Sequence, residues 1–294
     1  MRVTVPDLVA VTAACAVLGE GPLWHPLEQA LFFVDIERRQ LFRLVPASGE
    51  ARSWRLPSRI GCFAFRRDGS LVVALEDGFW FFEPATGGLR PIVDPEPGLA
   101  GNRFNDGRVD PRGRFFAGTM DMAEKAPTGS LWRLDPDLSV HAVERGIGIS
   151  NGIDWSPDGR RMYHTDSLAR SIYVYDYDPA SGEARGRRLF AQLAAGEGFP
   201  DGLCVDAEGF VWSAIWDGAR LLRFDPEGRV EREIRLPVPR PTACGFGGPA
   251  LDTLYVTSAR IGLSAEALAQ APLSGAVLAF QPGVRGRPTT MFAG

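Results

Sequence analysis

The feature that most constrains the fold of this chain is one pattern that recurs along its whole length. A polar or small residue, in most copies next to a glycine, precedes an apolar segment, a turn and two further strand-like segments. The clearest copies begin at residues 151–159 (NGIDWSPDG) and 201–209 (DGLCVDAEG). Further copies begin near Glu20, Gly61, Asn105 and Cys244. Together they make six units at a spacing of roughly 40 to 50 residues, the range of propeller blades.

The repeat predicts an all-β fold, a six-bladed β-propeller. A long and uniform period is typical of four-stranded blades around a channel and does not suit a sandwich. The 34 glycines and 23 prolines, many in turn pairs, divide the chain into short elements and exclude long helices. We expect residues 1–294 to form a single domain. A strand within residues 9–17 should complete the last blade, because it would join the first blade to the sixth and remove the open edge.

The repeat also aligns six positions at the start of each innermost strand. These are Glu20, Gly61, Asn105, Asn151, Asp201 and Cys244. In a propeller such positions point toward the axis, so Glu20 and Asp201 would place two like charges near a narrow channel. That arrangement is costly unless a cation or solvent compensates the charges. Carboxylate and amide oxygens suit Ca²⁺, Mg²⁺ or Mn²⁺, which predicts a central metal site.

The alternative is that the Asn-Gly and Asp-Gly pairs are ordinary turn residues, as most such pairs are. Their recurrence at one register, before an apolar strand and not between hairpin strands, favours the metal site.

The composition removes several other chemistries. Lys125 is the only lysine among 32 basic residues, and there are only three histidines, so lysine chemistry and a three-histidine zinc site have few candidates. A net charge of −4 without a Lys/Arg-dense stretch argues against a nucleic-acid partner. No apolar run is long enough to span a membrane. The four cysteines show no C-x-x-C spacing, which favours a reduced, cytoplasmic setting.

Four segments, in order, resemble the signature segments of the SMP-30/gluconolactonase/regucalcin-like family. They are residues 18–24 (LGEGPLW), 102–107 (NRFNDG), 150–156 (SNGIDWS) and 200–203 (PDGL). The similarity covers essentially the whole chain. Members of this family are six-bladed propellers that hydrolyse sugar lactones with a bound divalent metal. The resemblance therefore implies a metal-dependent lactonase acting on an aldonolactone such as glucono-, xylono- or arabinonolactone. The metal could be Ca, Zn, Mn, Mg or Fe(II), and the oligomeric state stays open.

The resemblance also implies the roles of individual residues. Glu20, Asn151 and Asp201 would be the metal ligands, and Asp201 would also be the base that takes a proton from water. Arg103 and Asn105 would bind substrate. They are two residues apart, so on an extended backbone they face the same side. A metal with three protein ligands keeps positions open for water and substrate, which fits ring-opening hydrolysis.

One loop departs from the animal members of the family. After residues 118–120 (GTM) a glutamate that contacts substrate is expected two or three residues later, but Asp121, Met122 and Ala123 stand there and Glu124 follows. We predict Asp121 as a substrate contact. Substrate preference would depend on this loop.

Two other functions are compatible with the residues. A calcium-dependent phosphotriesterase or aryl-esterase propeller would use Glu20, Asn105, Asn151 and Asp201 as four metal ligands. A propeller without enzymatic activity could bind calcium or a sugar lactone as a buffer or sensor.

Other candidate residues have structural explanations. Asp35, Asp166 and Asp217 follow the second strand of their repeats, which is typical of aspartates that cap turns. Residues 148–152 match G-x-S-x-G, but a nucleophile elbow needs a helix after the motif and here another strand follows. His164 lies beside aromatic residues on a strand and is predicted to be a hydrogen-bonded structural residue.

Overall fold

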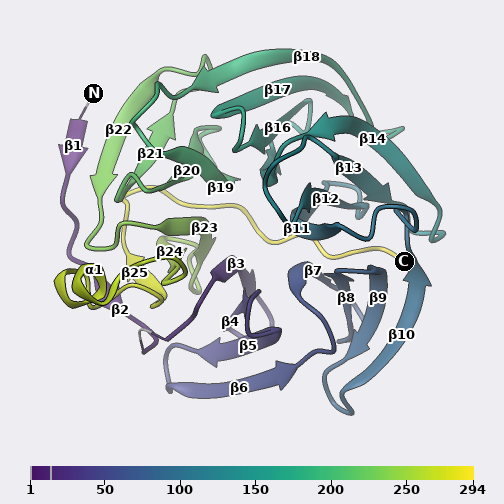
Figure 1. Cartoon of the computed structure of the whole chain (residues 1–294), viewed down its shortest axis with the longest axis horizontal. Coiled ribbons are helices and arrows are strands. Elements are labelled where there is room, and N and C mark those ends of the chain that lie inside the picture. The colour runs from purple at the N-terminus through teal and green to yellow at the C-terminus, as the bar shows by residue number, and fades with distance from the viewer. Residues whose placement is uncertain (1, 14) are drawn as a thin grey trace.

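The computed structural model describes residues 2–13 and 15–294, and in these residues six sheets are arranged in a ring (Figure 1). Each sheet is one blade of a six-bladed β-propeller, which confirms the predicted fold class. A short helix, α1 (Ala265–Gln270), follows β24 in blade six. No helix in the described part of the chain is long and apolar enough to cross a membrane.

Each blade is built of consecutive antiparallel strands, with the first strand of each repeat innermost. Blade one contains β3 (Gly19–His25), β4 (Ala30–Asp35), β5 (Gln40–Val45) and β6 (Glu50–Arg55); blade two contains β7 (Ile60–Phe65), β8 (Leu71–Leu75), β9 (Gly78–Glu83) and β10 (Gly88–Val93). Blade three contains β11 (Asn102–Val109), β12 (Phe115–Asp121), β13 (Gly129–Leu134) and β14 (Val140–Ile147); blade four contains β15 (Ser150–Trp155), β16 (Arg161–Asp166), β17 (Ser171–Asp178) and β18 (Glu183–Gln192). Blade five contains β19 (Phe199–Val205), β20 (Val211–Trp216), β21 (Arg220–Phe224) and β22 (Val230–Arg235); blade six contains β23 (Pro241–Gly247), β24 (Thr253–Ser258) and β25 (Leu278–Phe280).

The N-terminal segment closes the ring. β2 (Val9–Ala10) pairs antiparallel with β25 and forms the outermost strand of blade six, as predicted, although the paired stretch is shorter than residues 9–17. Ala14, within that stretch, lies outside the described residues. β1 (Arg2–Thr4) was not predicted as a strand. It pairs in parallel with β22 and adds a fifth strand to blade five.

The innermost strands crowd one another at the axis. A β-bulge interrupts the pairing of each described inner strand close to its start. A Cβ added at Gly152 would lie 2.3 Å from the backbone nitrogen of Leu203, and one at Gly202 would lie 2.4 Å from the Cβ of Ala243. Neither glycine has a positive φ. These two glycines are therefore required by the close approach of neighbouring strands. They are not the ordinary turn residues of the alternative interpretation.

The register corrects one aligned position. In blade six the bulge lies between Pro241 and Cys244, as it lies between Pro200 and Leu203 in blade five, so the residue equivalent to Asp201 is Thr242. Cys244 was misaligned by two residues, because glycine does not follow the axial residue in this blade.

The hydrophobic core lies between adjacent blades. Trp212 from blade five and Phe246 from blade six, for example, belong to one buried cluster and meet edge to face. The blade strands also carry buried tryptophans, with Trp24 at 4%, Trp132 at 5%, Trp155 at 1% and Trp212 at 0% exposure. Each blade is thus stabilised mainly by its neighbours in the ring.

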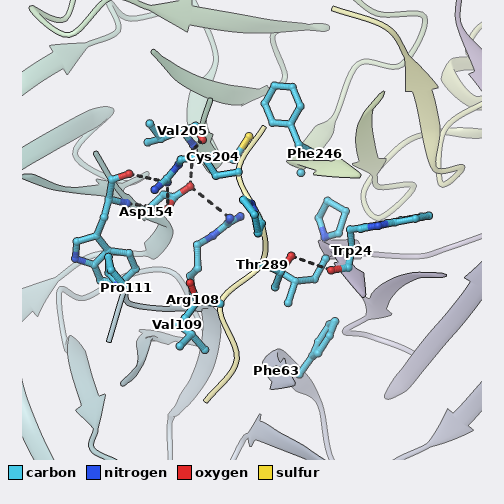
Figure 2. Close-up of a pocket in the computed structure, with 17 residues that line it drawn as sticks. Trp24, Phe63, Arg108, Val109, Pro111, Asp154, Cys204, Val205, Phe246 and Thr289 are labelled. Carbon is cyan, nitrogen blue, oxygen red and sulfur yellow. Dashed lines mark hydrogen bonds and ion pairs between the residues drawn. The ribbon is translucent and has the colours of Figure 1, made fainter. Parts of the chain in front are cut away.

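The C-terminal strap, residues 285–294, crosses one end of the axis (Figure 1). It bonds to every blade: Gly286 N to Leu251 O in the blade six turn, Ala207 N to Arg285 O in blade five, Arg287 Nη2 to Asp154 Oδ1 in blade four, Thr289 Oγ1 to Trp24 O in blade one, Phe292 N to Phe65 O in blade two, and Ala293 N to Gly113 O in blade three. A small cavity of about 50 Å³ remains beside the strap, where Arg108 and Arg287 share the carboxylate of Asp154 (Figure 2). The strap therefore ties the ring together at this end.

Blade five contains a buried ion pair at a hairpin. Asp206 is fully buried and accepts hydrogen bonds from Trp212 Nε1 at 2.9 Å and from Arg223 Nη2 at 2.7 Å. Arg223 is itself 3% exposed. Asp225, in the next hairpin, begins the same D-x-x-G pattern and accepts the equivalent backbone N–H bonds, but its partner Arg229 is exposed.

We predict that Asp206→Asn lowers the free energy of unfolding by about 3 kcal/mol, because Arg223 would lose the one fully buried carboxylate among its three acidic partners and would keep only the more exposed Glu208 and Glu231. The matched control, Asp225→Asn, should have a much smaller effect, because its ion pair is open to solvent. Urea unfolding of the two variants measures the difference. Equal losses would show that the hairpin bonds, and not the buried ion pair, account for the stability.

Candidate functional site

A cavity of about 210 Å³ lies at the start of the inner strands. Because β3, β11, β15 and β19 all begin here, this is the end of the axis opposite to the strap. The residues that line it are Leu18, Glu20, Arg103, Asn105, Met120, Glu124, Ile149, Asn151, Ser167, Leu168, Phe199, Asp201 and Trp216. The sequence predicted six ligand or substrate-binding residues, and five of them line this cavity: Glu20, Arg103, Asn105, Asn151 and Asp201.

The acidic residues of the cavity lie in an environment that disfavours their charged form. Burial, reinforced by the charges of Asp201 and Asp106, raises the pKa of Glu20 well above its usual value. Burial and the charge of Asp106 likewise raise the pKa of Asp201, although Arg103 acts in the opposite direction. Burial raises the pKa of Asp106 itself. Ionising these three neighbouring carboxyl groups together is therefore unfavourable, and Arg103 and Arg108 offset this only in part.

Asp106 does not line the cavity, but its charge acts on Glu20 and Asp201, and the sequence did not indicate this. It follows Asn105 in the Asn-Asp-Gly segment, and the sequence suggested only that Asn105 faces the axis. The bulge in β11 at this point breaks the alternation of side chains, which is why a strict two-residue period does not identify Asp106.

The donor set fits a hard divalent cation. Asn151 donates from Nδ2 to Ser167 Oγ at 2.9 Å, but its Oδ1 is buried and has no hydrogen-bond partner. A buried acceptor without a partner is destabilising, and a cation would satisfy it. The described residues contain no group of three or more His, Cys, Asp or Glu placed to hold a metal. A cation here would therefore rest on two carboxylates, Glu20 and Asp201, and one amide oxygen.

Arg103 and Asn105 form one buried unit. Arg103 Nη1 donates to Asn105 Oδ1 at 2.7 Å and to the carbonyl of Phe104 at 3.0 Å. Asn105 Nδ2 in turn donates to the carbonyl of Ser150 at 2.9 Å. Since the oxygen of Asn105 already accepts from a cationic group, binding a metal ion to the same oxygen would bring two positive charges together. This geometry favours Asn105 on the substrate side of the site.

The structure does not bring Asp121 to the cavity. Its carboxylate accepts backbone hydrogen bonds from Ala123, Lys125 and Ala126, each at 3.1 Å, and so fixes the turn that follows β12. Glu124, on this turn, lines the cavity instead. The family resemblance predicts a glutamate in this loop, two or three residues after Met120. Glu124 lies one position beyond that range.

Two further aspartates hold the segments that lead into the site. Asp35 accepts backbone N–H bonds from residues 17 and 18, and Asp166 accepts them from residues 148 and 149. These segments precede β3 and β15, which carry Glu20 and Asn151. The predicted capping role of Asp35 and Asp166 is confirmed.

The chain is similar to proteins of known name over nearly its whole length. Residues 18–260 match the family model described as "SMP-30/Gluconolactonase/LRE-like region". The chain belongs to this family. A 6-deoxy-6-sulfogluconolactonase from Pseudomonas putida is 41% identical over 289 residues, 98% of this chain and 99% of the relative. An L-arabinolactonase from Azospirillum brasilense is 40% identical over 281 residues, 94% of this chain and 92% of the relative. The solved structure of regucalcin, a calcium-binding protein from Agrobacterium tumefaciens, superposes with a TM-score of 0.95 at 29% identity and 99% coverage of both chains.

A buried histidine supports the site in this member of the SMP-30/gluconolactonase family. His164 Nε2 lies 2.8 Å from Ser150 Oγ, and Ser150 is the residue whose carbonyl binds Asn105. Burial lowers the pKa of His164 to about 4 from an ordinary value of 6.5. The folded protein therefore keeps this ring neutral at pH values where the unfolded chain protonates it.

We predict that His164 contributes a pH dependence to stability. Stability from the neutral ring is complete above pH 6.5 and is lost as the pH falls toward 4, by about 2 kcal/mol at pH 5. Urea unfolding at pH 7 and at about pH 5 should show a smaller drop for His164→Asn than for the wild type. His141→Asn, which changes an exposed ring, is the control. An identical drop in all three proteins would contradict the prediction.

Proposed function

We propose that this protein hydrolyses the ester bond of an aldonolactone to give the open-chain aldonic acid, using a divalent cation held by Glu20, Asn151 and Asp201. The observation that carries the proposal is the buried, unpartnered Oδ1 of Asn151 in a cavity with two buried carboxylates. The names of the two relatives, a sulfogluconolactonase and an arabinolactonase, support the reaction class. The calcium-binding regucalcin supports a divalent cation.

The residues of the cavity have separate roles in the proposed reaction. A divalent cation, when bound, would polarise the lactone carbonyl and lower the pKa of a water molecule. Asp201 accepts a proton from the attacking water while the water oxygen forms a bond to the carbonyl carbon. When the ring C–O bond breaks, the same proton passes to the ring oxygen, which leaves as a hydroxyl group. No other reactant is consumed.

Arg103 and Asn105 position the substrate. Arg103 has N–H donors beyond the one that binds Asn105 and Phe104, and these can stabilise negative charge that develops on the carbonyl oxygen. Because Asn105 is held between Arg103 and Ser150, its remaining hydrogen-bonding capacity has a fixed direction toward one sugar hydroxyl. Because Asn105 Oδ1 is bound to Arg103, it is poorly suited to be the fourth metal ligand that a phosphotriesterase propeller would need.

We predict that Asp201→Asn reduces kcat for aldonolactone hydrolysis by at least about 1,000-fold at saturating metal, because the base is lost. The variant should be no less stable than the wild type without metal, because it removes a buried acidic group that lies near Glu20 and Asp106. Asp225→Asn, the same change on a distant hairpin, should retain full activity. Wild-type turnover by Asp201→Asn would refute the proposed role.

Metal titration distinguishes the two ligand sets. After chelation, a divalent ion at about 100 times its Kd should stabilise the wild type by about 2.7 kcal/mol. Asn151→Ala should lose most of this stabilisation, whereas Asn105→Ala should keep it and show a raised KM. Equal loss of metal stabilisation in both variants would favour four ligands. Thermal unfolding with Ca²⁺, Mg²⁺, Mn²⁺ and Zn²⁺ in turn provides the measurement.

A further inference from the structure

The mouth of the cavity differs in character from its base. The base is formed by the buried polar residues described above. The rim, defined as the partly or fully exposed residues that line the cavity, consists of Leu18, Ile149, Leu168, Phe199, Trp216 and Glu124. The rim is therefore apolar except for one carboxylate.

The rim carries no basic side chain. Among the described residues that line the cavity Arg103 is the only basic one, and it is buried at the base. Arg170 lies behind the rim, with its guanidinium 3.9 Å from the centre of the Phe199 ring and a bond to the carbonyl of Gly198. Lys125, next to Glu124 in the chain, is not among the lining residues.

A second arginine, Arg240, lies against Trp216 and also has partners of its own. Arg240 stacks on the Trp216 ring and forms an ion pair with Asp217 at 2.6 Å. Asp217, predicted to cap a turn, thus has its carboxylate in an ion pair. Arg240 and Arg170 thus both have partners of their own, and neither lines the cavity.

Glu124 is held in place by its backbone. Its φ of 55° lies in the left-handed region, which residues other than glycine seldom adopt. The turn is maintained by the three backbone bonds to the Asp121 carboxylate and by a bond from Glu124 N to Asp121 O at 2.9 Å. Backbone conformations of this kind are concentrated at ligand-binding loops. Asp121 thus acts as a positioning residue for the one charged group of the rim.

We propose that the cavity selects uncharged sugar lactones and disfavours lactones that carry a second anionic group, and that Glu124 is the residue that makes this distinction. The inference rests on the proposed lactonase function. With the carbonyl end of the lactone at Asp201 and Arg103, the far end of the sugar lies at the rim. A hydroxyl group there can donate to Glu124, and the C–H surface of the sugar can pack on Phe199 and Trp216. A sulfonate or phosphate would instead meet a like charge and an apolar surface.

The test compares two lactones that differ only in charge, glucono-δ-lactone and its 6-phosphate, with spontaneous hydrolysis subtracted. The wild type should show a kcat/KM at least about tenfold higher for the uncharged lactone. Glu124→Lys should reduce that ratio by at least about tenfold, because the repulsive charge becomes attractive. Asp137→Lys, the same charge change at an exposed and distant hairpin, should leave the ratio within about twofold.

Equal or better turnover of the phosphorylated lactone by the wild type would overturn the inference, and so would an unchanged ratio in Glu124→Lys. If neither lactone is hydrolysed, the proposed function fails. The charge preference is then tested by measuring how far gluconate and 6-phosphogluconate, the two product acids, each raise the thermal unfolding temperature. Stronger stabilisation by gluconate, reversed in Glu124→Lys, would support the inference, and any other result would reject it.

Discussion

The close approach of the inner strands at the propeller axis is the constraint on which the rest of the structure depends. At Gly152 and Gly202 there is no room for a Cβ, because the backbone or side chain of the next blade occupies that space. The polar residue before each glycine must therefore extend from the bulged strand end into the cavity. The same packing that closes the ring brings Asn151 and Asp201 to one site.

This convergence destabilises the apo site and must be compensated elsewhere. Glu20 and Asp201 are buried and Asp106 lies partly buried near them, and each carboxyl has a raised pKa because desolvation disfavours its charge. The apolar clusters between blades and the C-terminal strap stabilise the ring around this acidic centre. A protein arranged in this way has the properties expected of a preformed cation site: rigid surroundings, like charges and an acceptor without a partner.

The features that recur were the easiest to predict from the sequence. The six units and most of the axial positions follow from periodicity, and the closing strand follows from the need to cover an open sheet edge. Cys244 was aligned in place of Thr242 because no glycine follows Thr242, and Asp106 was missed because a bulge alters side-chain direction. Glu124 reaches the cavity through a backbone conformation that no local residue preference indicates. The strap contains no repeat at all, and its bonds to all six blades arise only from the tertiary structure.

We propose that the inner-strand register creates one cation site from Glu20, Asn151 and Asp201. Anomalous diffraction from a crystal soaked in Mn²⁺ tests it most directly. We expect a strong anomalous peak at coordination distance from an oxygen of each of these three residues, with Asn105 still bound to Arg103. A peak elsewhere, or a peak coordinated by Asn105 in place of Asn151, would contradict it.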